Sequence, residues 1–84
     1  MRQEILAAKG QLAVSRRELI ELEVQARGLV QLVRGALSPY EKDVTFLRAD
    51  EAASAAASLA EVIRKMKEIK AEIAKLEADL GREA

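Results

Sequence analysis

The strongest helical pattern in the chain lies in residues 59–80, which read LAEVIRKMKEIKAEIAKLEADL. Apolar residues recur there at alternating spacings of three and four, at Leu59, Val62, Met66, Ile69, Ile73, Leu76 and Leu80. This spacing places them on one narrow stripe of an α-helix, which is the a/d seam of a coiled coil. We therefore expect residues 59–80 to be helical and to pack along this seam against another helix.

A second, weaker seam occupies the N-terminal part of the chain. Its two series, each with a seven-residue repeat, are Ile5, Leu12, Leu19, Ala26 and Val33, and Ala8, Ser15, Leu22, Leu29 and Ala36. The spacing predicts a helix over about residues 2–34. Leu6, Ala13 and Ile20 border the seam, and more apolar residues crowd its end. One partner helix cannot cover so wide an apolar face, so a third or fourth helix is implied.

Residues 35–38 are predicted to be a tight turn. Gly35 is suited to end the first helix in the left-handed conformation. Ser38-Pro39-Tyr40-Glu41 matches a capping box, with Pro39 at the first helical position. A second helix is therefore expected over about residues 39–80, ended by Gly81, with a kink or false start near Asp50-Glu51 as an alternative.

Two long helices joined by so short a turn must double back on each other. The predicted fold is a single all-α domain over residues 1–84, an antiparallel two-helix hairpin that resembles a coiled coil. A turn near residue 37 pairs residues whose numbers add to about 74, which sets the alanine-rich residues 52–60 against residues 14–22. The expected hairpin core is Ile5, Leu12, Leu19, Leu22, Leu59, Val62, Met66 and Ile69.

In this register the first helix ends before the second seam does, so Ile73, Leu76 and Leu80 have no partner within the chain. A chain of 84 residues buries only a marginal core, and a two-helix hairpin buries less. We therefore expect the hairpin to form a homodimer or a higher oligomer, most simply a four-helix bundle. The candidate residues for its interface, or for another protein, are Leu29, Val30, Leu32, Val33, Ile73, Leu76 and Leu80.

The composition argues against an enzyme or a metal protein. The chain has no cysteine and no histidine. Disulfides, thiolate chemistry, the usual zinc ligands and the commonest general base at neutral pH are therefore absent. Its carboxylates have neither a histidine nor a glycine-rich loop beside them. We expect no catalytic residues, no cofactor, no metal and no small-molecule substrate.

The apolar runs are too short for a membrane span, which needs about 18 consecutive residues. The N-terminal residues also lack the continuous apolar core of a secretion signal, because Glu4 and Lys9 interrupt it. A cytoplasmic location is expected.

A basic run at Arg64–Lys75 is the one candidate for nucleic-acid contact. Acidic residues alternate with its bases, and Glu61–Lys65, Arg64–Glu68 and Lys75–Asp79 are pairs of opposite charge at helical spacing. The chain also has 14 basic and 14 acidic residues, without the basic surplus usual in nucleic-acid binders. A solvated, salt-bridged helix face is the favoured interpretation, and nucleic-acid binding is the alternative.

Two further features leave alternatives open. Tyr40 and Phe46, the two aromatic residues, lie near the hairpin turn. They either cover the end of the core or form a tip that docks on a partner. Gly10 and Gly28 lie inside the first predicted helix, where each costs about 1 kcal/mol relative to alanine. They are either tolerated surface positions or sites of close helix approach.

The sequence thus predicts a non-enzymatic structural or interaction protein, acting as an adaptor, an assembly chaperone or an accessory subunit. Its partners would be its own copies and another protein. Small size and alanine-, leucine-, glutamate- and arginine-rich composition are typical of bacterial proteins, and favour a phage or operon-linked accessory protein. The alternative is a nucleic-acid-associated accessory protein that uses the Arg64–Lys75 run.

Overall fold

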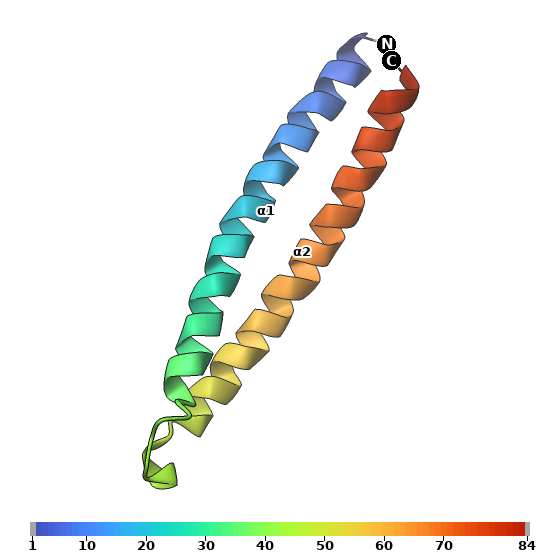
Figure 1. Cartoon of the computed structure of the whole chain (residues 1–84). Helices are drawn as coiled ribbons and strands as arrows, with labels where there is room; N and C mark the ends of the chain where they lie inside the picture. Colours follow the sequence, from blue (N-terminus) through green and yellow to red (C-terminus); the bar gives the residue numbers. More distant parts are fainter. Residues whose placement is uncertain (1, 84) are drawn as a thin grey trace.

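The chain forms two antiparallel helices that lie side by side along their length (Figure 1). The computed structural model describes residues 2–83. Helix α1 spans Arg2–Ala36 and helix α2 spans Ala49–Glu83, each with 35 residues. A single 3-10 turn, η1, spans Val44–Phe46 in the connection between them. No strand occurs in this part of the chain, and the predicted all-α helical hairpin is confirmed.

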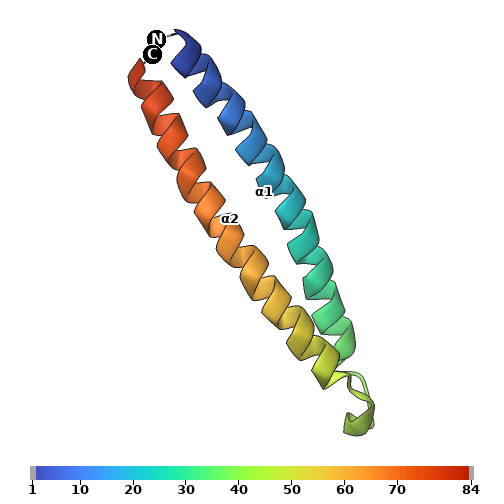
Figure 2. The same ribbon diagram turned by 180° about the vertical axis from the view of Figure 1, so that it is seen from behind.

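The hairpin is a rod. Its principal extents are 64 × 17 × 14 Å, and its radius of gyration is 18.9 Å. A compact domain of this length would have a radius of gyration of about 12 Å. The chain termini lie together at one end of the rod, the open end, and the connection closes the other end (Figure 2).

The connection is longer than the predicted turn, and α2 begins at Ala49, ten residues later than expected. The Ser38 hydroxyl accepts a hydrogen bond from the Tyr40 amide at 3.3 Å, but the Glu41 amide bonds the Ser38 carbonyl, so this segment forms a turn and no helix follows. The Asp43 carboxylate accepts from both the amide and the hydroxyl of Thr45, at 3.0 and 2.6 Å. This local bonding competes with helix formation and favours a 3-10 turn.

The two predicted glycine stops are also wrong. Gly35 lies inside α1 and Gly81 inside α2, and none of the described residues has a positive φ angle. The Leu37 amide still bonds the Val33 carbonyl at 3.0 Å, so α1 continues past Gly35. The first amide–carbonyl bond of α2 runs from Ala52 to Arg48, and Asp50 and Glu51 in the first turn place negative charge at the positive end of the helix dipole.

The longer connection changes the register of the hairpin. The Arg48 amide bonds the Ala36 carbonyl at 3.0 Å, and the Gln11 side chain bonds Glu72 at 2.6 Å. With the Arg16–Glu77 ion pair, these contacts join residues whose numbers add to 84, 83 and 93, so residues at the same level have numbers that add to about 84–88 and not to 74. The predicted overhang at the end of α2 is wrong, because Ile73, Leu76 and Leu80 now lie level with Leu12, Ala8 and Ile5.

The core is a thin seam between the helices. Its buried apolar side chains are Leu12, Ala36, Ala52, Ala55, Val62 and Ile69, and Ser15 is the one buried polar residue among the described side chains. The remaining residues of the predicted core, Ile5, Leu19, Leu22, Leu59 and Met66, are half-buried. In the observed register the alanine-rich residues 52–60 face residues 25–33, not 14–22. Small residues still oppose large ones, since Ala55 lies level with Leu29 and Ala52 with Val33.

Candidate interaction surface

The hairpin has two long flanks, one on each side of the seam, and polar contacts between described residues of α1 and α2 cross both of them. On the first flank Arg16 forms an ion pair with Glu77 at 3.2 Å. On the second flank Gln11 bonds Glu72. Arg16 directly follows a seam residue and Gln11 directly precedes one, so these contacts lie on opposite sides of the seam. We name the two sides the Arg16 flank and the Gln11 flank.

The Arg16 flank becomes apolar toward the connection. Val30 lies two heptads after Arg16 on α1, and Ile63 lies two heptads before Glu77 on α2, so both continue this flank. Leu37 and Ala56 follow at one further heptad. Val30, Leu37 and Ile63 expose 39, 43 and 40% of their surface, and Ala56 is exposed as well. We name these four residues the Val30 patch.

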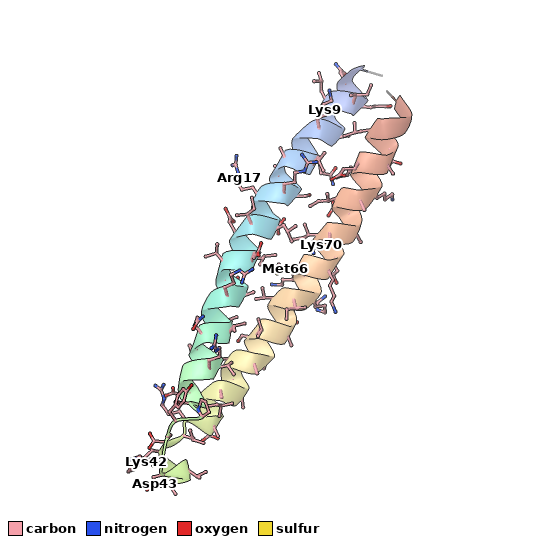
Figure 3. All side chains as sticks on the ribbon, viewed as in Figure 1. Lys9, Arg17, Lys42, Asp43, Met66 and Lys70 are labelled. Carbon is pink, nitrogen blue, oxygen red and sulfur yellow. The ribbon has the colours of Figure 1, made fainter. Side chains whose placement is uncertain are left out.

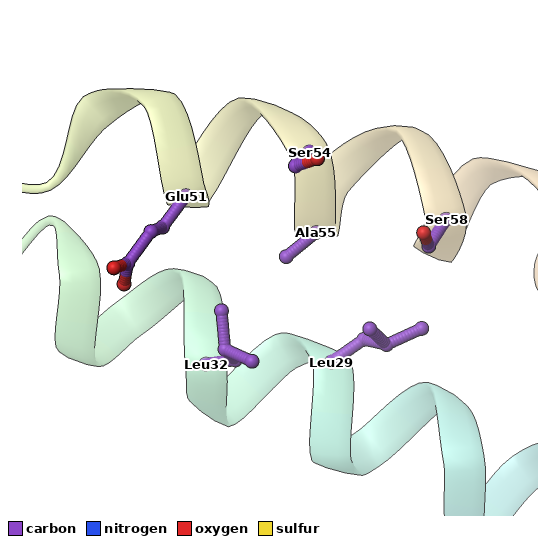
Figure 4. A pocket seen from close by; sticks show the side chains of 6 residues that line it. All are labelled: Leu29, Leu32, Glu51, Ser54, Ala55 and Ser58. Atoms are coloured by element: carbon purple, nitrogen blue, oxygen red, sulfur yellow. The ribbon is translucent and has the colours of Figure 1, made fainter.

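The Gln11 flank is different near the connection. A shallow groove of about 300 Å³ lies there, lined by Leu29, Leu32, Glu51, Ser54, Ala55 and Ser58. Leu32 points from α1 toward α2, Leu29 extends along α1 below Ser58, and Glu51 reaches from α2 toward α1 (Figure 4). The α1 wall of this groove is apolar, whereas the α2 wall carries a carboxylate and two hydroxyls.

The face of α1 that points away from α2 also carries exposed apolar residues, namely Leu6, Val14, Ile20 and Val24. Polar and charged residues interrupt this face, and Arg17 extends outward from it (Figure 3). It therefore presents apolar residues from one helix only, without a continuous apolar surface.

The residues predicted as an interface fall into three groups. Leu29 and Val33 are half-buried in the seam, and Val30 and Leu32 are exposed on opposite flanks. Ile73, Leu76 and Leu80 are half-buried near the open end, where they face α1. Leu37, Ala56 and Ile63 were not among the predicted interface residues, because Ala56 and Ile63 lie outside the α2 seam. Ile63 and Ala56 lie two and three heptads before Glu77, but this spacing identifies a flank only once the structure pairs Glu77 with Arg16.

The tip of the hairpin carries three exposed apolar side chains. Tyr40, Val44 and Phe46 expose most of their surface, and Lys42 and Asp43 extend from the same loop (Figure 3). The hypothesis that Phe46 covers the end of the core is therefore wrong, because η1 projects beyond the helices and carries Phe46 away from the seam. The alternative, a docking tip, stays a prediction.

The arginine of the basic run on α2, Arg64, is paired with two acidic neighbours. The Arg64 guanidinium bonds Glu61 through Nε and Nη2 and bonds Glu68 through Nη1 at 2.6 Å. The hydrogen bond and charge of Arg64 lower the pKa of Glu61, and Glu61 in turn raises the pKa of Arg64. Arg64 is thus engaged within its own helix, as the salt-bridged interpretation expects.

The lowered carboxyl pKa values give a prediction about acid. Hydrogen bonds from Thr45 lower the pKa of Asp43, as Arg64 lowers that of Glu61. A carboxyl whose pKa is lower in the folded state stabilises that state above its unfolded pKa, and the contribution is lost as the pH falls through the folded pKa. We expect stability to decrease below about pH 4, near the ordinary pKa of carboxyl groups.

Carboxyl NMR titration measures both pKa values directly. Thr45→Val should raise the pKa of Asp43 and leave the pKa of Glu61 unchanged. Arg64→Gln should raise the pKa of Glu61 and leave the pKa of Asp43 unchanged. Equal pKa values in the parent chain and in both variants would contradict the hydrogen bonds described above.

No cluster of three or more acidic, histidine or cysteine side chains suited to a metal ion occurs among the described residues. Neither α1 nor α2 has, within the described residues, an apolar stretch long enough to cross a membrane. Comparisons with protein-family models, curated proteins and solved structures found no match to this chain. The exposed apolar surface of the hairpin is therefore the feature on which a functional proposal can rest.

Proposed function

We propose that this chain is a non-enzymatic interaction protein, a helical hairpin that forms a homodimer with the architecture of a four-helix bundle. In this role it serves as an adaptor, an assembly chaperone or an accessory subunit for another protein in the cytoplasm. The observation that carries the proposal is the large apolar surface that the two helices leave uncovered.

The total exposed surface, polar and apolar together, shows how far the chain is from a compact monomer. The chain exposes 6724 Å² and has a mass of 9.2 kDa. A compact monomer of this mass would expose about 4,900 Å². The difference of about 1,800 Å² exceeds the roughly 800 Å² that each partner contributes to a standard interface. A second hairpin can therefore cover a full interface and still leave surface for another protein.

The thin core supports the same proposal. No described side chain is less than 2% exposed, and three of the six buried apolar residues are alanines. Burying a leucine or isoleucine fully contributes about 1.5–3 kcal/mol, so a core of small and half-buried residues stabilises the monomer weakly. Association would complete the burial of seam residues that are now half-exposed.

The nucleic-acid alternative has weaker support. Arg64, the arginine of the basic run, is held by two glutamates of its own helix. A phosphate would have to compete with these carboxylates for the guanidinium group. The net charge of zero also supplies no long-range attraction for a polyanion.

Light scattering coupled to size-exclusion chromatography tests the proposed dimer. At about 10 µM, a concentration at which specific dimers of sub-micromolar dissociation constant are populated, we expect a mass twice the 9.2 kDa of one chain. Far-ultraviolet circular dichroism on the same sample establishes that the chain is helical. A helical monomer at this concentration would contradict the proposal.

A further inference from the structure

We propose that the second copy of the chain docks on the Val30 patch, so that the dimer interface lies on the Arg16 flank in the half of the rod near the connection. This inference rests on the proposed function and specifies where its interface lies. It follows from a comparison of the three exposed apolar surfaces of the hairpin.

The Val30 patch is the surface to which both helices contribute apolar side chains. Val30 and Leu37 come from the α1 side, and Ala56 and Ile63 come from α2. On the Gln11 flank the residues of α2 at the same levels include Glu51 and Ser58, which a docked apolar helix would remove from water. The Glu51 carboxylate forms an ion pair with Arg48 at 3.4 Å, and both side chains are more than half exposed. Burying this pair together with the serine hydroxyls would remove polar groups from water, so the Gln11 flank is the poorer contact surface.

The outward face of α1 is the other competing surface. Its apolar residues are more exposed than those of the Val30 patch, but they come from one helix and Arg17 interrupts them. A contact there would not touch the seam. A contact on the Val30 patch would be continuous with it, because Leu29, Val33 and Leu59 are half-buried at the same levels. Docking on the Val30 patch would therefore enlarge the existing core, whereas docking on the outward face of α1 would create a separate core.

Ion pairs on the Arg16 flank limit the patch, and the Arg16–Glu77 pair is one of them. It crosses the same flank two heptads from Val30, which corresponds to about 21 Å along α1 at 1.5 Å per residue. Both of its side chains are more than half exposed. Glu23, one heptad before Val30 on the same flank, forms a second ion pair, with Arg27 at 3.0 Å. A contact that extended to either pair would take charged groups out of water, so the dry part of the interface ends between Val30 and Glu23.

A second copy is the occupant that fits this patch. In a twofold dimer the same patch faces itself, so apolar side chains meet apolar side chains and no charged residue of the patch is left unpaired. Ala56 and the exposed Ala53 and Ala60 beside it let a second helix approach closely. The total surface of the chain in excess of a compact monomer, about 1,800 Å², is also larger than one side of a standard interface. A different protein on this patch is an outcome that the experiment distinguishes.

The experiment compares glutamate substitutions inside and outside the patch. Val30→Glu and Ile63→Glu place a carboxylate in the proposed interface. Val24→Glu is the matched control, because Val24 lies on the same helix as Val30 but on the outward face, 69% exposed. Mass is measured by light scattering over a dilution series, with circular dichroism to monitor helicity.

We expect Val24→Glu to dimerise like the parent chain, and Val30→Glu and Ile63→Glu to raise the dimer dissociation constant at least 100-fold. Retention of the dimer by both patch variants would overturn the inference, and so would dissociation caused by Val24→Glu alone. In either case a dimeric parent chain would leave the proposed function standing. A monomeric parent chain would instead overturn the proposed function and leave the patch to a different protein.

A second measurement does not depend on charged substitutions. Because the chain has no cysteine, Ile63→Cys introduces a unique thiol in an uncharged side chain that is smaller than isoleucine. Its reaction with a thiol reagent should slow as the protein concentration rises through the dissociation constant. Ala57→Cys, at an exposed position of the same helix, should react at a rate independent of concentration. Equal behaviour of the two thiols would overturn the inference.

Discussion

Leu12→Ala is expected to lower the free energy of unfolding by about 2–3 kcal/mol, which corresponds to a fall in Tm of about 10–20 °C for a chain of this size. Leu12 is the least exposed leucine of α1, at 8%, and lies level with Ile73 in the seam. Truncation removes its transfer free energy and leaves a cavity that two rigid helices cannot close. Thermal unfolding followed by circular dichroism at one protein concentration measures the change.

Leu6→Ala is the matched control, because Leu6 lies on the same helix but is 67% exposed. We expect it to change stability by less than about 0.5 kcal/mol. A double-mutant cycle then tests the register. Leu12→Ala should couple to Ile73→Ala by at least about 0.5 kcal/mol and should add independently to Val62→Ala. Coupling to Val62 instead would support the register expected from the shorter turn.

Replacing Gly10 and Gly28 together by alanine is expected to raise the free energy of unfolding by about 2 kcal/mol, or about 1 kcal/mol for each position. Both glycines lie in the interior of α1 without a positive φ angle, and a methyl group added at either position meets no atom within 4 Å. The gain comes from the smaller conformational entropy of the unfolded chain. Thermal unfolding at fixed concentration measures it.

The same double variant decides between the two interpretations of these glycines. Within one hairpin neither glycine allows a close helix approach. If both are tolerated surface positions, the variant should be more stable and should have the same mass in solution as the parent chain. If the double variant is more stable but no longer forms the dimer, a second molecule must approach Gly10 or Gly28 closely in the parent dimer.

The fold class and much of the core could be predicted from the sequence. The a/d spacing of residues 59–80 is a property of the helix alone, so it does not depend on which helix packs against it. For the same reason Leu12, Val62 and Ile69 could be identified as core residues before their neighbours were known, and all three are buried. Val30 was also recognised as a surplus apolar residue at the end of the first seam.

The sequence left the start of α2 open between Pro39 and a false start near Asp50-Glu51, because two local signals compete. Ser38-Pro39 is a good helix start, but Asp43 bonds the backbone and hydroxyl of Thr45 and holds the following residues in a 3-10 turn. Each signal contributes about 1 kcal/mol, and sequence propensity does not rank differences of that size. The structure places the helix start at Ala49.

That one difference changed the candidate site. With the shorter turn, Ile73, Leu76 and Leu80 had no partner and formed the expected interface. With the observed connection they face α1, and the uncovered apolar surface moves to the other end of the rod. Ile63 belongs to the candidate site only in the observed register. Its neighbours on the flank come from α1, and they cannot be assigned before the register is known.

The sequence by itself determined that the chain forms long amphipathic helices and which stripe of each helix is apolar, because both follow from spacing along a single helix. The tertiary structure alone decided the register, because the length of the connection sets which residues of α1 and α2 lie at the same level. It also decided which apolar residues remain exposed. Exposure depends on what the opposite helix covers, and that is a property of the pair.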